Sequence, residues 1–240
     1  MCTVSFCINQ GEVIFTSNRD ERTIRPASTM PMVENVGSKN IIYPKDPQSG
    51  GTWIGCDDWG NCIILLNGGF EMHQLKEKYR MSRGIIVKES IGSNDPLKYI
   101  KEVELSDIEP FQVILYGNGR LDRMVWDGSE KHFFDLDIEK THIFSSVTLY
   151  DEKMRSDREM WWEDFLKSHE INGENIFKFH STYKSEDRNS GLVINRENIV
   201  KTYSVSQIIL NNNQGKFKHL DMQTNESKTI KFTIADVERI

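Results

Sequence analysis

The sequence contains no uninterrupted apolar run of the roughly 20 residues that a membrane-spanning helix needs. Its N-terminus also has no basic region followed by an apolar run, which is the pattern of a secretory signal. We therefore expect no membrane span and a cytoplasmic location.

A concentrated basic surface is also missing. The chain carries 30 Lys and Arg against 36 Asp and Glu, a formal charge of −6, with both signs mixed along its length. The most basic stretch, at 216–219, is short. Because nucleic-acid binding needs clustered positive charge, we expect no nucleic-acid partner and instead a small-molecule substrate or ligand.

Cysteine is scarce, with four residues at positions 2, 7, 56 and 62. Structural zinc sites favour two to four residues between ligand cysteines, whereas here four and five residues intervene. Cys2 and Cys7 differ by an odd number and would face opposite sides of one strand. We expect no metal site, and thiols that stay reduced in a cytoplasmic protein.

Segments with strand and helix patterns alternate in blocks along the 240 residues. The strand-like segments are 3–9, 12–18, 52–56, 62–67, 111–117, 120–128, 141–150, 199–210, 216–223 and 228–234, and the helix-like segments are 82–92, 95–104, 151–169 and 173–183. The stretch from 21 to 40 is polar, contains proline and has no such pattern. The aromatic stripe of the 151–169 helix is typical of a core-facing side rather than of a ligand site.

This order predicts an α+β fold of two antiparallel sheets with helices packed outside them. The first two strands do not alternate cleanly between apolar and polar residues, as expected of strands that are covered on both faces. No repeat or linker divides the chain, so we expect a single domain over 1–240.

The first hairpin places the chain's second residue beside a polar cluster. If Gln10 and Gly11 form a two-residue turn, paired residues sum to 21, and Cys2 lies opposite Arg19 with side chains roughly 5 Å apart at Cβ. A register shifted by one or two residues keeps the same neighbourhood, which also contains Asn18 and Asp20.

Two interpretations of Cys2 follow. It is either an ordinary residue at the start of a strand, or it becomes the first residue when Met1 is removed and acts as a nucleophile. In the second case its own α-amine, with an ordinary pKa near 7.7–8.0, can serve as the base. Arg19 would favour the thiolate, and Asp20 would hold the ammonium form of the amine.

Asn67 ends the apolar strand 62–67 and precedes Gly68 and Gly69. A side-chain amide at this point is a suitable donor for an oxyanion, and glycine lets a ligand approach the backbone closely. The alternative is that Asn67 only closes the strand and enters a turn.

These residues carry a family resemblance. The opening Met-Cys, the stretch SNRDE at 17–21, GGTWIG at 50–55 and SRG at 82–84 resemble the NRDE family, whose animal members are called transport and Golgi organisation proteins. The likeness extends over nearly the whole chain and implies a four-layer αββα sandwich of the N-terminal-nucleophile (Ntn) hydrolase type.

The start is also distantly similar to bile-salt hydrolases and penicillin V acylases. That similarity implies catalytic roles for Cys2, Arg19, Asp20 and Asn67 in cleaving a linear amide or related acyl bond, although the arginine of those enzymes aligns with Ser17 here and Arg19 is shifted two places along.

We expect Asn18, Gly68 and Tyr203 to contact the substrate. The family's late Thr-Arg-Ser-Ser-Thr segment corresponds to TYSVS at 202–206, where Tyr203 replaces the arginine. No cofactor is expected for hydrolysis. The alternative function is non-catalytic binding or trafficking of haem or an acyl or lipid ligand, although none of the six histidines lies in a haem-binding motif.

Overall fold

Two antiparallel sheets make up the centre of the molecule, in a computed structural model that describes residues 3–235. The first sheet has the order β10-β1-β2-β12-β13-β14, and β11 also pairs with β12. Its strands are β1 (Thr3–Asn9), β2 (Glu12–Arg22), β10 (His142–Ser145), β11 (Asn195–Arg196), β12 (Val200–Asn211), β13 (Gln214–Asp221) and β14 (Ser227–Thr233).

The second sheet follows chain order, from β3 to β9. Its strands are β3 (Met32–Val36), β4 (Lys39–Tyr43), β5 (Ile54–Asp57), β6 (Cys62–Asn67), β7 (Phe111–Gly117), β8 (Arg120–Trp126) and β9 (Lys131–Leu136). Four helices are described: α1 (Arg83–Gly92), α2 (Pro96–Glu102), α3 (Glu152–Ser168) and α4 (Gly173–Thr182).

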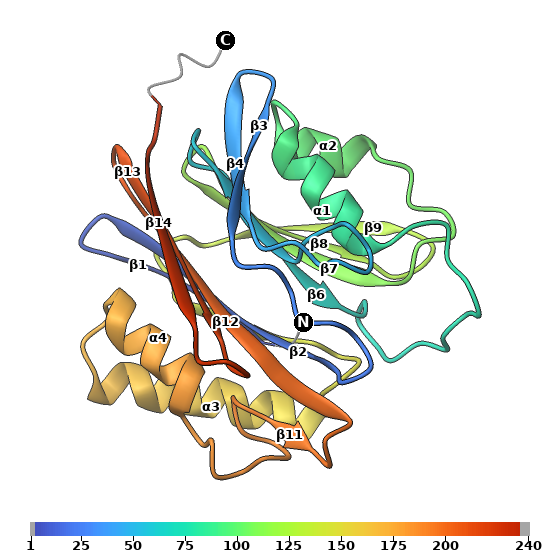
Figure 1. Cartoon of the computed structure of the whole chain (residues 1–240), viewed down its shortest axis with the longest axis vertical. Helices are drawn as coiled ribbons and strands as arrows, with labels where there is room; N and C mark the ends of the chain where they lie inside the picture. Colours follow the sequence, from blue (N-terminus) through green and yellow to red (C-terminus); the bar gives the residue numbers. More distant parts are fainter. Residues whose placement is uncertain (1–2, 236–240) are drawn as a thin grey trace.

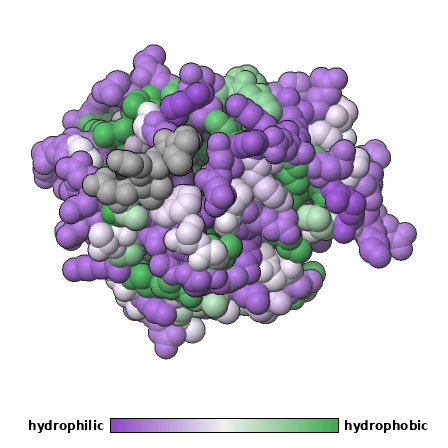
Figure 2. Space-filling view, turned by 90° about the horizontal axis from the view of Figure 1, so that it is seen from above, coloured by the Kyte–Doolittle hydropathy of each residue, from purple (hydrophilic) through white to green (hydrophobic). Residues whose placement is uncertain are grey.

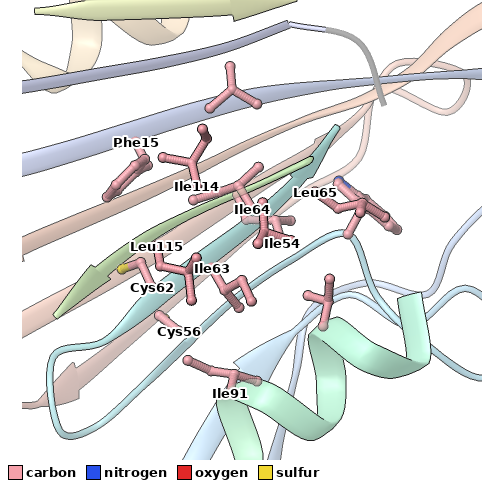
Figure 3. Close-up of a cluster of buried hydrophobic side chains, with 14 of the residues drawn as sticks. Phe15, Ile54, Cys56, Cys62, Ile63, Ile64, Leu65, Ile91, Ile114 and Leu115 are labelled. Carbon is pink, nitrogen blue, oxygen red and sulfur yellow. The ribbon is translucent and has the colours of Figure 1, made fainter. Parts of the chain in front are cut away.

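The four layers are visible in Figure 1, where α1 and α2 cover the outside of the second sheet and α3 and α4 cover the outside of the first. One hydrophobic cluster joins α1, the second sheet and the inner face of the first sheet. Figure 3 shows this cluster with Phe15 of β2 on one side of strands β5 to β7 and Ile91 of α1 on the other. A second cluster lies between the first sheet and helices α3 and α4. The predicted α+β, αββα architecture is confirmed.

The first hairpin has the predicted register. Thr3 pairs with Asn18 and Asn9 with Glu12, so every described pair sums to 21. Gln10 and Gly11 have φ values of 50° and 80°, the left-handed pair that a tight two-residue hairpin turn requires. Because β1 and β2 are interior strands, both faces are buried, and alternate side chains enter the inner core and the helix-facing core.

Two of the predicted helices begin directly after an aspartate N-cap. The carboxylate of Asp95 accepts a hydrogen bond from the Lys98 amide ahead of Pro96, and that of Asp151 accepts one from the Met154 amide. In α3 Trp162 and Phe165 are buried, which confirms a core role for this part of its aromatic stripe.

Three sequence expectations need correction. The polar stretch 21–40 contains β3, and β4 begins within it at Lys39. Strand β9 has no counterpart among the predicted strands. The predicted strand 141–150 ends at Ser145, since residues 147–149 form a turn that leads toward α3. Strands β3, β9 and β10 lie at the ends of their sheets, where none of their residues is fully buried and the sequence shows little apolar alternation.

The face seen in Figure 2 is mainly hydrophilic, with small apolar patches. Among residues 3–235 no helix is long and apolar enough to cross a membrane.

Candidate functional site

The end of β2 presents successive side chains to opposite sides of the first sheet. Arg19 points between the two sheets, where it meets Trp53, whereas Asn18 and Asp20 point toward the layer of α3 and α4. This alternation follows from the two-residue period of a strand. The polar cluster predicted from sequence is therefore divided between two environments.

Arg19 is almost completely buried, with 1% of its surface exposed. Its Nη2 donates to Asp46 Oδ2 at 3.2 Å, and its Cζ lies 4.8 Å from the ring centre of Trp53 and 5.7 Å from that of Tyr203. Its Nε and Nη1 have no hydrogen-bond partner among residues 3–235. The site thus holds a cation between aromatic rings with donor capacity left over.

Asp46 is held by its own turn. Its Oδ1 accepts the amides of Gln48 and Ser49, and its Oδ2 also lies 3.4 Å from Nη2 of Arg25. Asp46 therefore connects the buried Arg19 to Arg25. Arg25 lines a cleft at the end of β6.

Asp20 is also buried, on the opposite side of the sheet. Its Oδ2 accepts a hydrogen bond from the Tyr150 hydroxyl at 2.6 Å, and its Oδ1 accepts one from the Thr202 hydroxyl at 2.5 Å. Tyr150 is in turn stacked against the Arg158 guanidinium of α3, with 3.5 Å between Cζ and the ring centre. Two hydroxyl donors therefore hold this buried carboxylate in place.

The Asn18 side chain is fully buried and engaged with the α4 layer. Its Nδ2 donates to the carbonyls of His180 and Leu192, both at 2.9 Å, and its Oδ1 contacts Nδ1 of His180. His180 Nε2 in turn contacts Ser5 Oγ at 2.8 Å. This placement gives Asn18 a role in joining α4 to the first hairpin and leaves its side chain no open path to a ligand.

Asn67 lines a cleft of about 540 Å³ at the end of β6. Its carbonyl accepts a hydrogen bond from Ser146 Oγ, while its side chain is partly exposed. The cleft has an apolar and a charged part; its other lining residues are Glu21, Arg22, Ile24, Arg25, Gln48, Met72, His73, Leu75, Arg83, Glu109, Thr148, Leu149 and Val200.

A smaller recess of about 40 Å³ shares Asn67, Glu21, Arg25 and Arg83 with the cleft. It is also lined by Asp46 and Trp53, two of the residues that contact Arg19. Arg19 thus lies directly behind the wall of this recess.

Gly68 and Tyr203 hold unusual backbone positions near these residues. Gly68 has φ +85°, and a Cβ there would lie 2.4 Å from Val147 Cγ2, so only glycine fits. Tyr203 lies at the bulge where the β2–β12 register shifts between Thr202 and Ser204. The Arg19 guanidinium lies over its ring.

Cys2 lies outside the described residues, so its predicted position opposite Arg19 stays a prediction. The other thiols are buried. Burial raises the pKa of Cys7 to about 12, and burial together with neighbouring acidic groups raises the pKa values of Cys56 and Cys62 well above the ordinary range. No group of potential metal ligands occurs among residues 3–235.

Sequence reasoning missed four residues that shape this site: Asp46, Trp53, Tyr150 and Thr202. Two of them had a signal. Trp53 belongs to the GGTWIG stretch and Thr202 to the TYSVS stretch, each of which lies against the β2 residues. Asp46 and Tyr150 lie in loops whose position depends on the tertiary fold.

The comparisons with known proteins agree with this architecture. A sequence model of the family described as Transport and Golgi organisation 2 matches residues 1–212. No curated protein sequence matches the chain significantly.

Solved structures resemble the fold, among them two hydrolases. One is a Caenorhabditis elegans orthologue of N-acylethanolamine-hydrolyzing acid amidase, with a TM-score of 0.61 and 11% identity over 86% of this chain and 92% of that one. The other is a variant of the conjugated bile acid hydrolase of Clostridium perfringens, with a TM-score of 0.50 and 12% identity over 97% and 98% of the two chains. At such identities the likeness shows an Ntn-hydrolase-like fold and nothing about substrate.

Proposed function

The chain belongs to the Transport and Golgi organisation 2 family, and from that premise we propose that it is an N-terminal-cysteine hydrolase. Cys2, freed by removal of Met1, would be the nucleophile, and a linear amide or related acyl bond the target. The resemblance of the fold to two hydrolases supports the reaction class.

The observation that carries the proposal is the buried Arg19 next to the hairpin's open end. Thr3, which is peptide-bonded to Cys2, pairs with Asn18, and the same register predicts that Cys2 pairs with Arg19. A buried guanidinium with unused donors stabilises a neighbouring thiolate and lowers its pKa. Asn67 supports the proposal as a partly exposed amide in the adjoining cleft.

The proposed reaction has two steps. The Cys2 thiolate attacks the acyl carbon, and the developing oxyanion accepts a hydrogen bond from the Asn67 side-chain amide. The C–N bond then breaks, and the leaving amine takes its proton from the α-ammonium group of Cys2. Water next attacks the thioester and gives its proton to the α-amine, and the C–S bond breaks to release the acid and restore the Cys2 thiolate and α-ammonium group.

The test is to trap the thioester. The purified protein is mixed with a series of activated acyl esters, quenched in acid and mapped by mass spectrometry. We expect an acyl adduct on the Cys2 peptide, none in Cys2→Ala, and a roughly 10²–10³-fold slower acylation in Asn67→Ala.

The matched control is Asn211→Ala, because Asn211 is exposed at the end of β12. It should acylate at the wild-type rate. An adduct that persists in Cys2→Ala, or no adduct on a chain whose Met1 has been removed, would overturn the proposal.

A second candidate is non-catalytic binding of haem or an acyl or lipid ligand. The observation in its favour is the mixed lining of the cleft, in which Met72, Leu75 and Leu149 lie beside Arg25 and Arg83. Saturable spectral titration by haem, or tight acyl-chain binding, without any turnover by the wild type would favour this function. No saturable change and a detectable thioester would remove it.

A further inference from the structure

Three loops surround the mouth of the cleft: residues 22–25, 70–81 and 196–201, the first and third counted together with the strand residues at their ends. We call these loops the rim. They lie on the same side of the molecule in Figure 1, near the ends of strands β2, β6 and β11, and together they contribute half of the residues that line the cleft.

The rim holds the most exposed large apolar side chains of residues 3–235. Ile24 is 84% exposed, Met72 71%, Leu75 64% and Ile199 60%, and no other large apolar side chain in the described chain exceeds 51%. Apolar residues gathered from three separate segments around one opening form a patch, unlike scattered single residues.

Hydrogen bonds hold the backbone of the rim loops in place, so the exposure of their apolar side chains does not result from unanchored chain. The Thr23 amide donates to the Ile199 carbonyl at 2.9 Å, and the Thr23 hydroxyl donates to the Asn198 carbonyl at 2.7 Å. In the long loop, the Arg80 amide donates to the Asp107 carbonyl at 2.9 Å. The backbone on both sides of the cleft is thus fixed with the apolar side chains facing solvent.

The charge of the rim is opposite to that of the chain. The three loops contain seven Lys and Arg against three Glu, whereas the whole protein has a formal charge of −6. Lys76 is paired with Asp107, but Arg22, Lys78 and Lys201 form no ion pair within residues 3–235. Apolar side chains projecting from a locally basic surface match the interface of an anionic lipid bilayer.

We propose that the rim is a docking surface for an anionic phospholipid bilayer. The apolar side chains enter the headgroup region, and the basic side chains contact lipid phosphates and carboxylates. The cleft then opens toward the bilayer, so that an amphipathic substrate can enter without crossing water. This last consequence rests on the proposed function, whereas docking itself does not require Cys2.

The experiment is co-sedimentation of the full chain with vesicles of phosphatidylcholine alone or mixed with phosphatidylserine. We expect binding to the mixed vesicles that weakens with added salt, and much weaker binding to phosphatidylcholine. The triple variant Ile24→Ser, Met72→Ser, Leu75→Ser should lower the vesicle affinity at least about tenfold, since three apolar contacts are removed.

Two further variants complete the test. Val33→Ser with Met160→Ser removes two apolar side chains, each 51% exposed, on β3 and α3, and should bind as the wild type does. The double variant Arg22→Glu, Lys78→Glu, the charge variant, should remove the preference for vesicles that contain phosphatidylserine. If the triple variant does not fold, the charge variant tests the proposal in its place.

The proposal is overturned if the wild type does not bind mixed vesicles at low salt, which includes the case where a protein covers the rim. It is also overturned if the triple variant, or in its place the charge variant, binds as the wild type does. Cys2→Ala should bind vesicles normally. Vesicle binding without any acyl adduct would therefore contradict the hydrolase function alone, and an adduct without vesicle binding would contradict docking alone.

Discussion

At the scale of single residues, the site depends on how a buried cation is neutralised. Arg19 has one carboxylate partner among residues 3–235, Asp46, and the remaining contacts of its guanidinium are aromatic faces. Removing one partner of a buried pair leaves the other charged and unsolvated, which costs more than the pair itself contributes.

We therefore predict that Asp46→Asn lowers the free energy of unfolding by about 3 kcal/mol, as measured by urea denaturation. Asp135→Asn is the control, because Asp135 is 75% exposed and lies 3.9 Å from Arg120. It should change the stability by less than about 1 kcal/mol. A variant at Asp46 that is as stable as the control would show that the pair does not hold Arg19.

Two buried histidines make the stability depend on pH. Burial lowers the pKa of His180 to about 3 and, with a smaller contribution from Arg19, the pKa of His219 to about 4, against 6.5 for an ordinary histidine. Between the folded pKa values and pH 6.5, the unfolded chain therefore binds protons at these two histidines that the folded chain does not bind. The stability from these residues is complete above about pH 6.5 and decreases as the pH falls toward the folded pKa values.

For His219 this predicts a loss of about 2 kcal/mol between pH 7 and pH 5. In His219→Gln the decrease in unfolding free energy over this range should be smaller by about that amount, and in His169→Gln, where the ring is exposed, it should equal that of the wild type. Equal decreases in all three proteins would contradict a depressed pKa for His219.

The residue scale also shows where sequence reasoning about the site stops. The position of Arg19 at the open end of the hairpin was predictable, because a two-residue turn fixes every later pair. The division of the cluster between two faces was not predicted: Asn18 and Asp20 share the helix-facing side and Arg19 the other. Asp46 had no local signal, because its contact with Arg19 arises only when the second sheet folds over the first.

At the scale of elements, the site depends on a close crossing between the segment before β5 and the start of α1. A Cβ at Gly51 would lie 2.2 Å from the backbone carbon of Gly84, and one at Gly84 would lie 2.9 Å from the Thr52 carbonyl oxygen. The Thr52 amide donates to the Gly84 carbonyl at 2.9 Å across this contact. Two motifs distant in sequence, GGTWIG and SRG, thus meet backbone to backbone beside Trp53.

Gly51→Ala should therefore push α1 away from the sheet and cost at least about 2 kcal/mol of stability, measured by urea denaturation. Gly92→Ala, at the other end of α1, is the matched control, since its Cβ would make an ordinary 3.6 Å contact with Val36. It should be neutral or slightly stabilising. A Gly51→Ala variant with wild-type stability would show that the crossing has room for a methyl group.

Elements with a strong local pattern were predictable, and those without one were not. The helix caps at Asp95 and Asp151 and the Asn118-Gly119 turn mark their elements directly. Strand β3 has mostly exposed side chains and includes Glu34 and Asn35, so nothing in its composition separates it from a loop. Backbone pairing with β4 across the turn at residues 37–38 places it at the edge of the second sheet, where packing imposes no apolar alternation on its sequence.

At the scale of the whole molecule, the fold buries every described thiol and places its main polar site at the open end of one hairpin. Cys7 lies between the first sheet and the helices, and Cys56 and Cys62 lie opposite each other in the second sheet. Their exposures are 1%, 0% and 0%, and their pKa values are raised. In the native protein, three of the four cysteines are therefore unreactive near neutral pH.

The most direct test of Cys2 as the nucleophile is to treat the native protein briefly with limiting iodoacetamide and then determine its intact mass and peptide map. We predict a chain without Met1, alkylated at Cys2 alone, with Cys7, Cys56 and Cys62 modified only after denaturation. The Cys2→Ala variant should remain unmodified in the native state. A chain that retains Met1, or one in which Cys2 reacts no faster than the three buried cysteines, would contradict this role.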